Sequence, residues 1–269
     1  MRVYWFRGRP NYGDALAPLL VHKFAGIAAQ WVPPPLSDGV VIGSLVGRLP
    51  RRYYGVVVGI GKFHEAARAD LSRARVLGLR GQLTLKDSGA KGDPALGDPG
   101  LLVAELLDSR PEPTHELGIV PHLSDQELAL RYPDAHYIDV GGDPIAITRE
   151  LASCKRVVSS SLHGLVAADA LGIERRWELS PGTLSGGAFK FRDYGTALGI
   201  NVEPDRWDTA PMAAVESVCN GLRDVFREIP AALAEERFRT IHRSLQVADA
   251  TPAWLGRRVR RMTGNRNAR

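Results

Sequence analysis

The chain has 269 residues, enough for one large domain or two of ordinary size, and its 44% hydrophobic and 24% charged residues are typical of a globular protein. Its formal net charge of +5 arises in the segment 256–269, which holds six arginines and no acidic residue. The rest of the chain is close to neutral, which argues against a broad nucleic-acid-binding face, and no apolar run reaches the ~20 residues of a transmembrane helix.

The two cysteines, Cys154 and Cys219, have no metal-ligand spacing and are too few for a disulfide framework. We therefore expect buried thiols and no metal site. The segment 1–10 carries an arginine within its apolar stretch and lacks a cleavage site, so we interpret it as a strand and not as a signal peptide. This interpretation predicts a cytoplasmic protein.

Short apolar runs alternate with amphipathic stretches along the first 200 residues, a pattern typical of βα units around a parallel sheet. Strands are predicted at 3–6, 40–46, 55–59, 76–79, 117–120, 137–140 and 156–159. Helices are predicted at 14–29, 64–73, 100–107, 124–132, 143–153 and 163–171. Residues 211–247 predict two further helices separated by Pro230.

The segment 108–116 is rich in proline and charge and is the expected linker. The predicted fold class is therefore α/β with two halves, 1–110 and 115–205, followed by C-terminal helices and a basic tail at 206–269. Ligands of open α/β sheets bind beyond the carboxyl ends of the strands. The residues that follow each strand are accordingly the candidates for a functional site.

The first strand ends carry glycines and polar residues. Asn11, Gly13 and Asp14 precede a predicted helix, where they form a turn and N-cap or present free N–H groups to a bound anion. Ser44 lies in a Gly-Ser-Leu-Val-Gly segment and Gly61 in a Gly-Ile-Gly-Lys segment. These glycines permit tight turns or a close approach of the backbone to a ligand, but neither segment is a dinucleotide fingerprint or a Walker loop.

Arg80 directly follows the predicted strand 76–79. It is either a surface residue or a fork for bidentate binding of phosphate or carboxylate. Asp98, in a Gly-Asp-Pro turn, is expected to cap the helix that begins at 100.

The most informative strand end is 156–159, which runs into S-S-L-H-G at 160–164 and then a helix of small residues. His163 is placed at the start of this helix. A positive helix end disfavours the imidazolium and a bound phosphate favours it, and these opposed effects suit general acid–base catalysis. His122, after strand 117–120, is a second candidate of this type, and for both the alternative is a structural histidine.

In this order, the motifs N-Y-G-D, I-G-S-L, V-V-G-I-G, G-L-R-G, G-D-P, I-V-P-H and S-S-L-H-G resemble those of the polysaccharide pyruvyl transferase family. The segment F-K-F-R-D-Y at 189–194 also resembles the family's pattern, so the similarity spans about residues 1–200. The chain departs from the family in being short and in having G-S-L where many members have a glycine triplet. These departures affect the prediction of which acceptor is bound more than the prediction of the donor.

The resemblance implies two Rossmann-like halves that face a cleft, as in GT-B glycosyltransferases. It also implies transfer of pyruvate from phosphoenolpyruvate to two hydroxyls of a sugar in a cell-surface glycan or its lipid-linked precursor, giving a cyclic ketal without a further cofactor. We expect His163 as the acid–base group, Asp14 as the acceptor-side base, Arg80 as a ligand of a donor anion and His122 as a phosphate contact. Further substrate contacts are expected from Asn11, Gly13, Ser44, Gly61, Ser161, Leu162 and Gly164.

Two other functions stay open at this point: a GT-B-like glycosyltransferase that uses a nucleotide sugar, and a non-catalytic glycan-binding protein of the same fold. Residues 253–263 combine four arginines with apolar residues, including Trp254 and Leu255. This pattern predicts either contact with the anionic inner face of a membrane or a solvated chain end.

Overall fold

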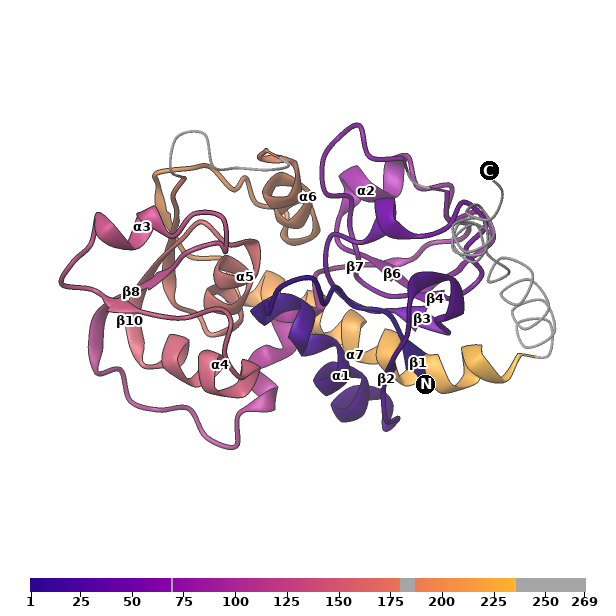
Figure 1. Ribbon diagram of the computed structural model, residues 1–269, viewed down its shortest axis with the longest axis horizontal. Helices are drawn as coiled ribbons and strands as arrows, with labels where there is room; N and C mark the ends of the chain where they lie inside the picture. Colours follow the sequence, from indigo (N-terminus) through magenta and orange to yellow (C-terminus); the bar gives the residue numbers. More distant parts are fainter. Residues whose placement is uncertain (69, 180–186, 236–269) are drawn as a thin grey trace, which may run out of the picture.

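The structure is a computed structural model that describes residues 1–68, 70–179 and 187–235. It contains two separate five-stranded sheets with helices packed around them (Figure 1). One sheet is built from residues before 80 and the other from residues after 110. The predicted α/β architecture is confirmed at this level.

The first sheet has the order β2-β1-β3-β4-β5 and is parallel throughout. Its strands are short: β1 (Arg2–Val3), β2 (Gln30–Trp31), β3 (Gly39–Val40), β4 (Val56–Val57) and β5 (Arg75–Val76). A separate parallel pair, β6 (Gly78–Leu79) and β7 (Ala95–Leu96), follows. The strands predicted at 3–6, 40–46 and 55–59 end earlier than expected, and the strand predicted at 76–79 is divided between β5 and β6. After β3 and β4 the backbone turns at Gly43 and Gly59, whose positive φ angles are 101° and 57°.

The second sheet has the order β12-β11-β10-β8-β9, in which β12 alone is antiparallel. Its strands are β8 (His115–Val120), β9 (His136–Tyr137), β10 (Cys154–Ser159), β11 (Glu174–Trp177) and β12 (Trp207–Asp208). Residues Val157–Ser159 at the centre of this sheet are fully buried. Burial on both faces explains why β8 and β10 end as continuous apolar runs and do not alternate.

The helices α1, α4 and α5 lie where the sequence predicts helices, and α3 occupies part of the predicted range 124–132. The predicted helix at 100–107 is a 3-10 helix. The helical elements before the last one are α1 (Tyr12–Ala25), η1 (Pro34–Leu36), η2 (Val46–Arg48), α2 (Gln82–Lys86), η3 (Pro99–Leu106), α3 (Glu127–Leu130), α4 (Pro144–Ala152), α5 (Leu162–Ala170) and α6 (Phe189–Leu198).

The predicted helix at 64–73 is wrong, since the described residues of this range form turns and bends. The Asp70 carboxylate accepts hydrogen bonds from the backbone N–H and the hydroxyl of Ser72. Such local side-chain hydrogen bonds compete with helix formation.

The helix α7 (Met212–Ala234) is continuous through Pro230, so the predicted break at this proline is also wrong. Pro230 is exposed, whereas Leu222, Phe226 and Ile229 of the same helix are buried. Burial of these side chains offsets the roughly 3 kcal/mol that an interior proline costs a helix.

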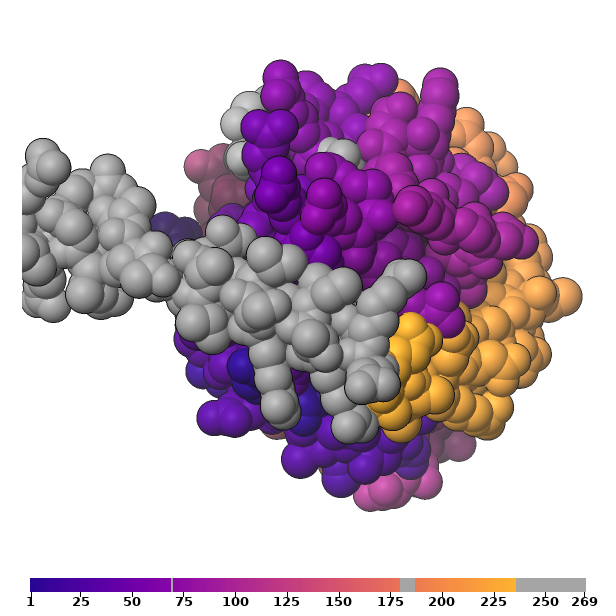
Figure 2. Space-filling view, turned by 90° about the vertical axis from the view of Figure 1, so that its right-hand side faces the viewer, coloured from indigo at the N-terminus to yellow at the C-terminus, as the bar shows by residue number. Residues whose placement is uncertain are grey.

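The helix α7 also connects the two halves. It packs against α5 and α6 in the second half and against β4 and β7 in the first, and it runs across the molecule in Figure 1. Figure 2 shows its yellow C-terminal part beside the violet first half, where Arg75 forms an ion pair with Glu228 at 2.8 Å. One hydrophobic cluster accordingly contains Leu16 and Val56 of the first half together with Leu165 of the second.

Within the described ranges, no helix is long and apolar enough to cross a membrane, and no group of three or more His, Cys, Asp or Glu side chains could hold a metal ion. The basic tail at 256–269 and its expected membrane contact lie outside the described residues.

Candidate active site

A cavity of about 550 Å³ lies at the carboxyl ends of strands from both sheets. Phe6 and Ser44 reach it from the segments after β1 and β3, and His122 and Ser161 from the segments after β8 and β10. Its volume falls within the roughly 300–1,000 Å³ of small-molecule sites. The cavity is therefore where the strand-end rule places a ligand.

Most of the residues singled out from the sequence line this cavity. From the first half these are Asn11, Asp14 and Ser44, and from the second half His122, Ser161, Leu162 and His163. Gly13, Gly61, Arg80 and Gly164 are not among the lining residues.

The three glycines outside the cavity permit close packing behind it. A Cβ atom at Gly13 would overlap the imidazole of His163, and one at Gly61 would overlap the guanidinium of Arg80. A Cβ atom at Gly164 would meet the hydroxyl of Ser159 on β10. The three glycines therefore act by allowing His163, Arg80 and Ser159 to pack closely. The structure does not place them in the cavity wall, where the sequence predicts contact with the substrate.

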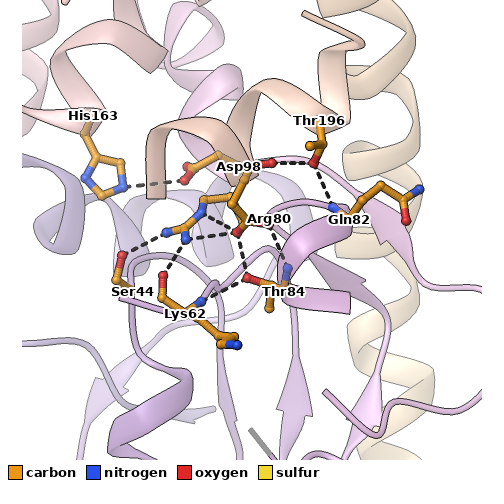
Figure 3. Close-up of polar contacts among 9 residues, drawn as sticks. Ser44, Lys62, Arg80, Gln82, Thr84, Asp98, His163 and Thr196 are labelled. Carbon is orange, nitrogen blue, oxygen red and sulfur yellow. Dashed lines mark hydrogen bonds and ion pairs between the residues drawn. The ribbon is translucent and has the colours of Figure 1, made fainter. Parts of the chain in front are cut away.

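His163 faces a buried carboxylate, as Figure 3 shows. Its Nε2 lies 3.7 Å from Oδ2 of Asp98, and neither atom has a hydrogen-bond partner in the described part of the chain. The other oxygen of Asp98 accepts the N–H of Gly100 at 2.9 Å, which is the predicted cap of η3. Burial lowers the pKa of His163, Asp98 opposes this effect, and the positive charges of Arg80 and Lys190 add to it.

Asp14, in the first turn of α1, is 7% exposed and accepts a hydrogen bond from the Asn11 amide at 2.9 Å. Asn11 is also the N-cap of α1, as predicted, and accepts the N–H of Gly13 at 3.1 Å. Burial raises the pKa of Asp14 to about 7, although Arg48 and the backbone N–H of Phe6 oppose the shift. Asp14 thus exchanges its proton near neutral pH.

His122 is held by the loop that follows β8. Its backbone N–H donates to Oγ of Ser160 at 2.9 Å, and its Nδ1 accepts the N–H of Ser124 at 3.2 Å. Burial lowers the pKa of His122 to about 4, with a further contribution from Lys190. The ring is therefore neutral near pH 7 and carries its proton on Nε2, so it can donate a hydrogen bond but supplies no charge.

Arg80 lies behind the cavity wall and is fully buried. Its Nε donates to Asp193 Oδ2 at 3.0 Å, its Nη1 to Ser44 Oγ at 2.8 Å, and its Nη2 to the carbonyl of Lys62 at 2.6 Å (Figure 3). Every guanidinium nitrogen is thus engaged within the protein. The Arg80 guanidinium, which the sequence predicts to bind a substrate anion, binds the Asp193 carboxylate instead. Asp193 is 113 residues further along the chain, and α6 places it against the end of β6.

Sequence reasoning did not assign several charged residues to this site, among them the cavity-lining Arg9 and Arg48. Lys190 and Asp98 are the two that bear on the chemistry proposed below. Lys190 of α6 lines the cavity although it is only 5% exposed, and Asp98 faces His163 in addition to capping η3. The F-K-F-R-D-Y segment, which contains Lys190, was notable only because it resembles the family's pattern. The Gly-Asp-Pro motif predicted that Asp98 caps a helix. No residue near it in the sequence showed that α5, which carries His163, would pack beside it.

The model of the family described as polysaccharide pyruvyl transferase matches residues 53–175. This range contains Arg80, Asp98, His122 and His163. The match confirms the family resemblance that the motifs indicated.

Two proteins of known sequence are similar to this chain. The succinoglycan biosynthesis protein ExoV of Rhizobium meliloti (strain 1021) is 27% identical over 232 residues, which cover 82% of this chain and 71% of that protein. The uncharacterized protein L143 of Acanthamoeba polyphaga mimivirus is 42% identical over 115 residues, which cover 39% of this chain and 40% of that protein. The chain thus spans less than half of the mimiviral relative.

Proposed function

We propose that this chain is a polysaccharide pyruvyl transferase, which transfers pyruvate from phosphoenolpyruvate to two hydroxyls of one sugar and forms a cyclic ketal. The family model that matches residues 53–175 supports this proposal. The observation that carries the proposal is the cavity at the strand ends, which both His163 and Asp14 line. The similarity to ExoV, a succinoglycan biosynthesis protein, supports a polysaccharide or its precursor as the acceptor.

The proposed reaction joins one donor and one diol without an oxidant or reductant. A proton adds to the methylene carbon of phosphoenolpyruvate, and a sugar hydroxyl adds to C2 and loses its own proton. The C2–O bond to phosphate then breaks, and the second hydroxyl closes the ring as it loses its proton. The products are the ketal and inorganic phosphate.

His163 is the proposed proton donor to the methylene carbon. The Asp98 carboxylate behind its Nε2 favours the imidazolium, and an anionic donor in the cavity favours it further. Asp14 is the proposed base for the acceptor hydroxyl, since a carboxyl with a pKa of about 7 is well matched to proton transfer at neutral pH. His122 donates a hydrogen bond from Nε2 to the phosphate.

The two sheets are proposed to act as GT-B-like halves, each of which contributes its strand ends to the cavity. Asp14 and Ser44 come from the first half, and His122 and His163 from the second. Neither half alone contains both proposed proton-transfer groups.

Calorimetric titration with phosphoenolpyruvate and with a nucleotide sugar, each in the presence of a chelator, tests the choice of donor. We expect phosphoenolpyruvate to bind without a metal, and the nucleotide sugar not to compete with it. Binding of the nucleotide sugar alone would favour a glycosyltransferase, and binding of neither would favour a glycan-binding protein. A strict requirement for a divalent cation would show that the phosphate is neutralised in another way.

A further inference from the structure

Lys190 is a buried cation that faces the cavity. It lies in the first turn of α6, is 5% exposed, and lines the cavity that contains Asp14 and His163. Its Nζ lies 5.7 Å from the ring centroid of Phe63 and 5.1 Å from that of Phe191. Within the described part of the chain, its ammonium forms neither a hydrogen bond nor an ion pair.

This position is energetically unfavourable for an ammonium in the unliganded protein. Burial disfavours the charge, the first turn of a helix repels cations, and the aromatic rings compensate only in part. Burial and the neighbouring charge of Arg80 together lower the pKa of Lys190 to about 8, and Asp14 opposes the shift. An anion in the cavity would supply the missing partner.

We propose that Lys190 is the cation that binds an anionic group of the donor substrate in this cavity. The inference rests on the proposed function, because it takes the donor to be phosphoenolpyruvate, whose carboxylate and phosphate both need a positive partner. Arg80 is fully buried behind the cavity wall, where Asp193, Ser44 and the Lys62 carbonyl engage its nitrogens. Arg9 and Arg48 also line the cavity, but both are exposed, whereas Lys190 is buried.

The geometry gives Arg80 a positioning role instead. Asp193 lies one turn after Lys190 on α6, and the Arg80–Asp193 ion pair of 2.9 Å fixes this turn against the end of β6. Thr84 strengthens the attachment, because its backbone N–H and hydroxyl donate to Asp193 at 2.8 and 2.6 Å. The pair thus holds Lys190 at the cavity wall.

The test compares the wild-type protein with K190M, K190R and the control K155M by calorimetric titration with phosphoenolpyruvate. Lys155 is an exposed lysine at the opposite end of β10 from the cavity. Loss of a charge-assisted contact should weaken binding by about 10- to 100-fold in K190M. K190R should keep part of the affinity, and K155M all of it.

The pH dependence of binding separates a direct role from a structural one. Between about pH 7 and pH 9.5 a phosphate monoester is fully ionised, since its second pKa is about 6. Wild-type affinity should fall as the pH rises through about 8, because Lys190 then loses its proton. This fall should be absent in K190M and in K190R, whose guanidinium stays charged.

The other groups near Lys190 are Asp14 on α1, His163 on α5, His122 after β8, and Arg80 after β6. Asp14 also titrates in this range, with a pKa of about 7. The charge of Lys190 lowers the pKa of Asp14, so K190M also changes the titration of Asp14. K190R keeps a positive charge beside Asp14, so the difference between the wild-type and K190R profiles reports Lys190.

The same titrations with inorganic phosphate and with pyruvate identify the anionic group. A loss in K190M with phosphate assigns Lys190 to the phosphate, and a loss with pyruvate assigns it to the carboxylate. Equal phosphoenolpyruvate binding by wild type and K190M, with both folded by circular dichroism, overturns the inference and leaves the proposed function intact. If the wild type binds phosphate but not phosphoenolpyruvate, the donor is wrong, and the phosphate titration of K190M still decides the role of Lys190. Absence of binding of all three probes contradicts both proposals.

Discussion

Asp14 and His163 are two ionisable groups at one cavity whose pKa values burial moves in opposite directions. Loss of water disfavours the charged form of each, so the carboxyl retains its proton to a higher pH and the imidazole loses its proton at a lower pH. Such pairs are characteristic of acid–base sites. An anionic donor in the cavity favours the protonated imidazole and the proposed role of His163 as proton donor. Asp14 then takes the role of base for the acceptor hydroxyl.

The pH profile of D14N tests the role of Asp14. As the pH falls through about 7, the wild-type carboxyl takes up a proton and can no longer accept one, so kcat/KM should decrease on the acidic side. In D14N this acidic limb should disappear, and turnover should drop by ~10²–10⁴.

The matched control is D224N, which removes an exposed carboxylate on α7 that pairs only with the nearby Arg227 among the contacts described. This variant should keep both the rate and the pH profile of the wild type. An acidic limb that persists in D14N would assign the titration to another group and contradict the proposed base.

The strand-end rule could predict Asn11 and Asp14 at the edge of one sheet and His122 and His163 at the edge of the other, because each follows a strand. That the two edges face one cleft was implied only by the family resemblance. The sequence could not place Arg80 or Lys190. The partner of Arg80 is 113 residues away, and a lysine in an amphipathic helix usually points to solvent. Both positions depend on how α6 packs against the first half, which no local pattern contains.

At the level of elements, α6 and α2 meet through buried charges. Asp193 and Arg80 are both fully buried, and Thr84 of α2 donates two hydrogen bonds to the same carboxylate. A Cβ atom at Gly81 would overlap the backbone of Asp193, so the two elements pack as closely as glycine allows. The polar network is satisfied only while all of its members are present.

Removal of one partner should therefore be costly. We expect D193A to lower the free energy of unfolding by about 3–5 kcal/mol, because Arg80 would keep a buried charge without its partner. Urea unfolding followed by circular dichroism measures this loss. The neighbouring control R192A removes an exposed side chain and should change stability by no more than about 0.5 kcal/mol. A similar small effect of D193A would show that the network contributes little.

The elements that the sequence predicted correctly are those with strong local signals. Helix α1 has an Asn cap, although it ends at the Gly26 C-cap and not at the predicted residue 29. The strands β8 and β10 contain the apolar runs 117–120 and 157–158. The errors at 64–73 and at Pro230 have opposite causes. In the first, local hydrogen bonds of Asp70 outweigh helical periodicity, and in the second, burial of one face of α7 outweighs the local effect of a proline.

At the level of the whole molecule, the cavity requires both halves. The hydrophobic cluster that includes Leu16, Leu165 and Phe226 joins them, and α7 packs against both. Asp14 and His163 are 149 residues apart in the sequence, but both line one cavity. The proposed chemistry is therefore a property of the assembled chain and not of either sheet.

Mass spectrometry of surface glycans tests the central proposal most directly. Cells that lack the gene should be compared with cells that carry the wild-type gene or the H163A variant. With the wild type we expect glycan units heavier by one pyruvate less one water. We expect this increment to be lost in the deletion strain and with folded H163A protein. Identical glycans in the wild-type and deletion strains would contradict pyruvyl transfer, and an increment retained with H163A would contradict His163 as the proton donor.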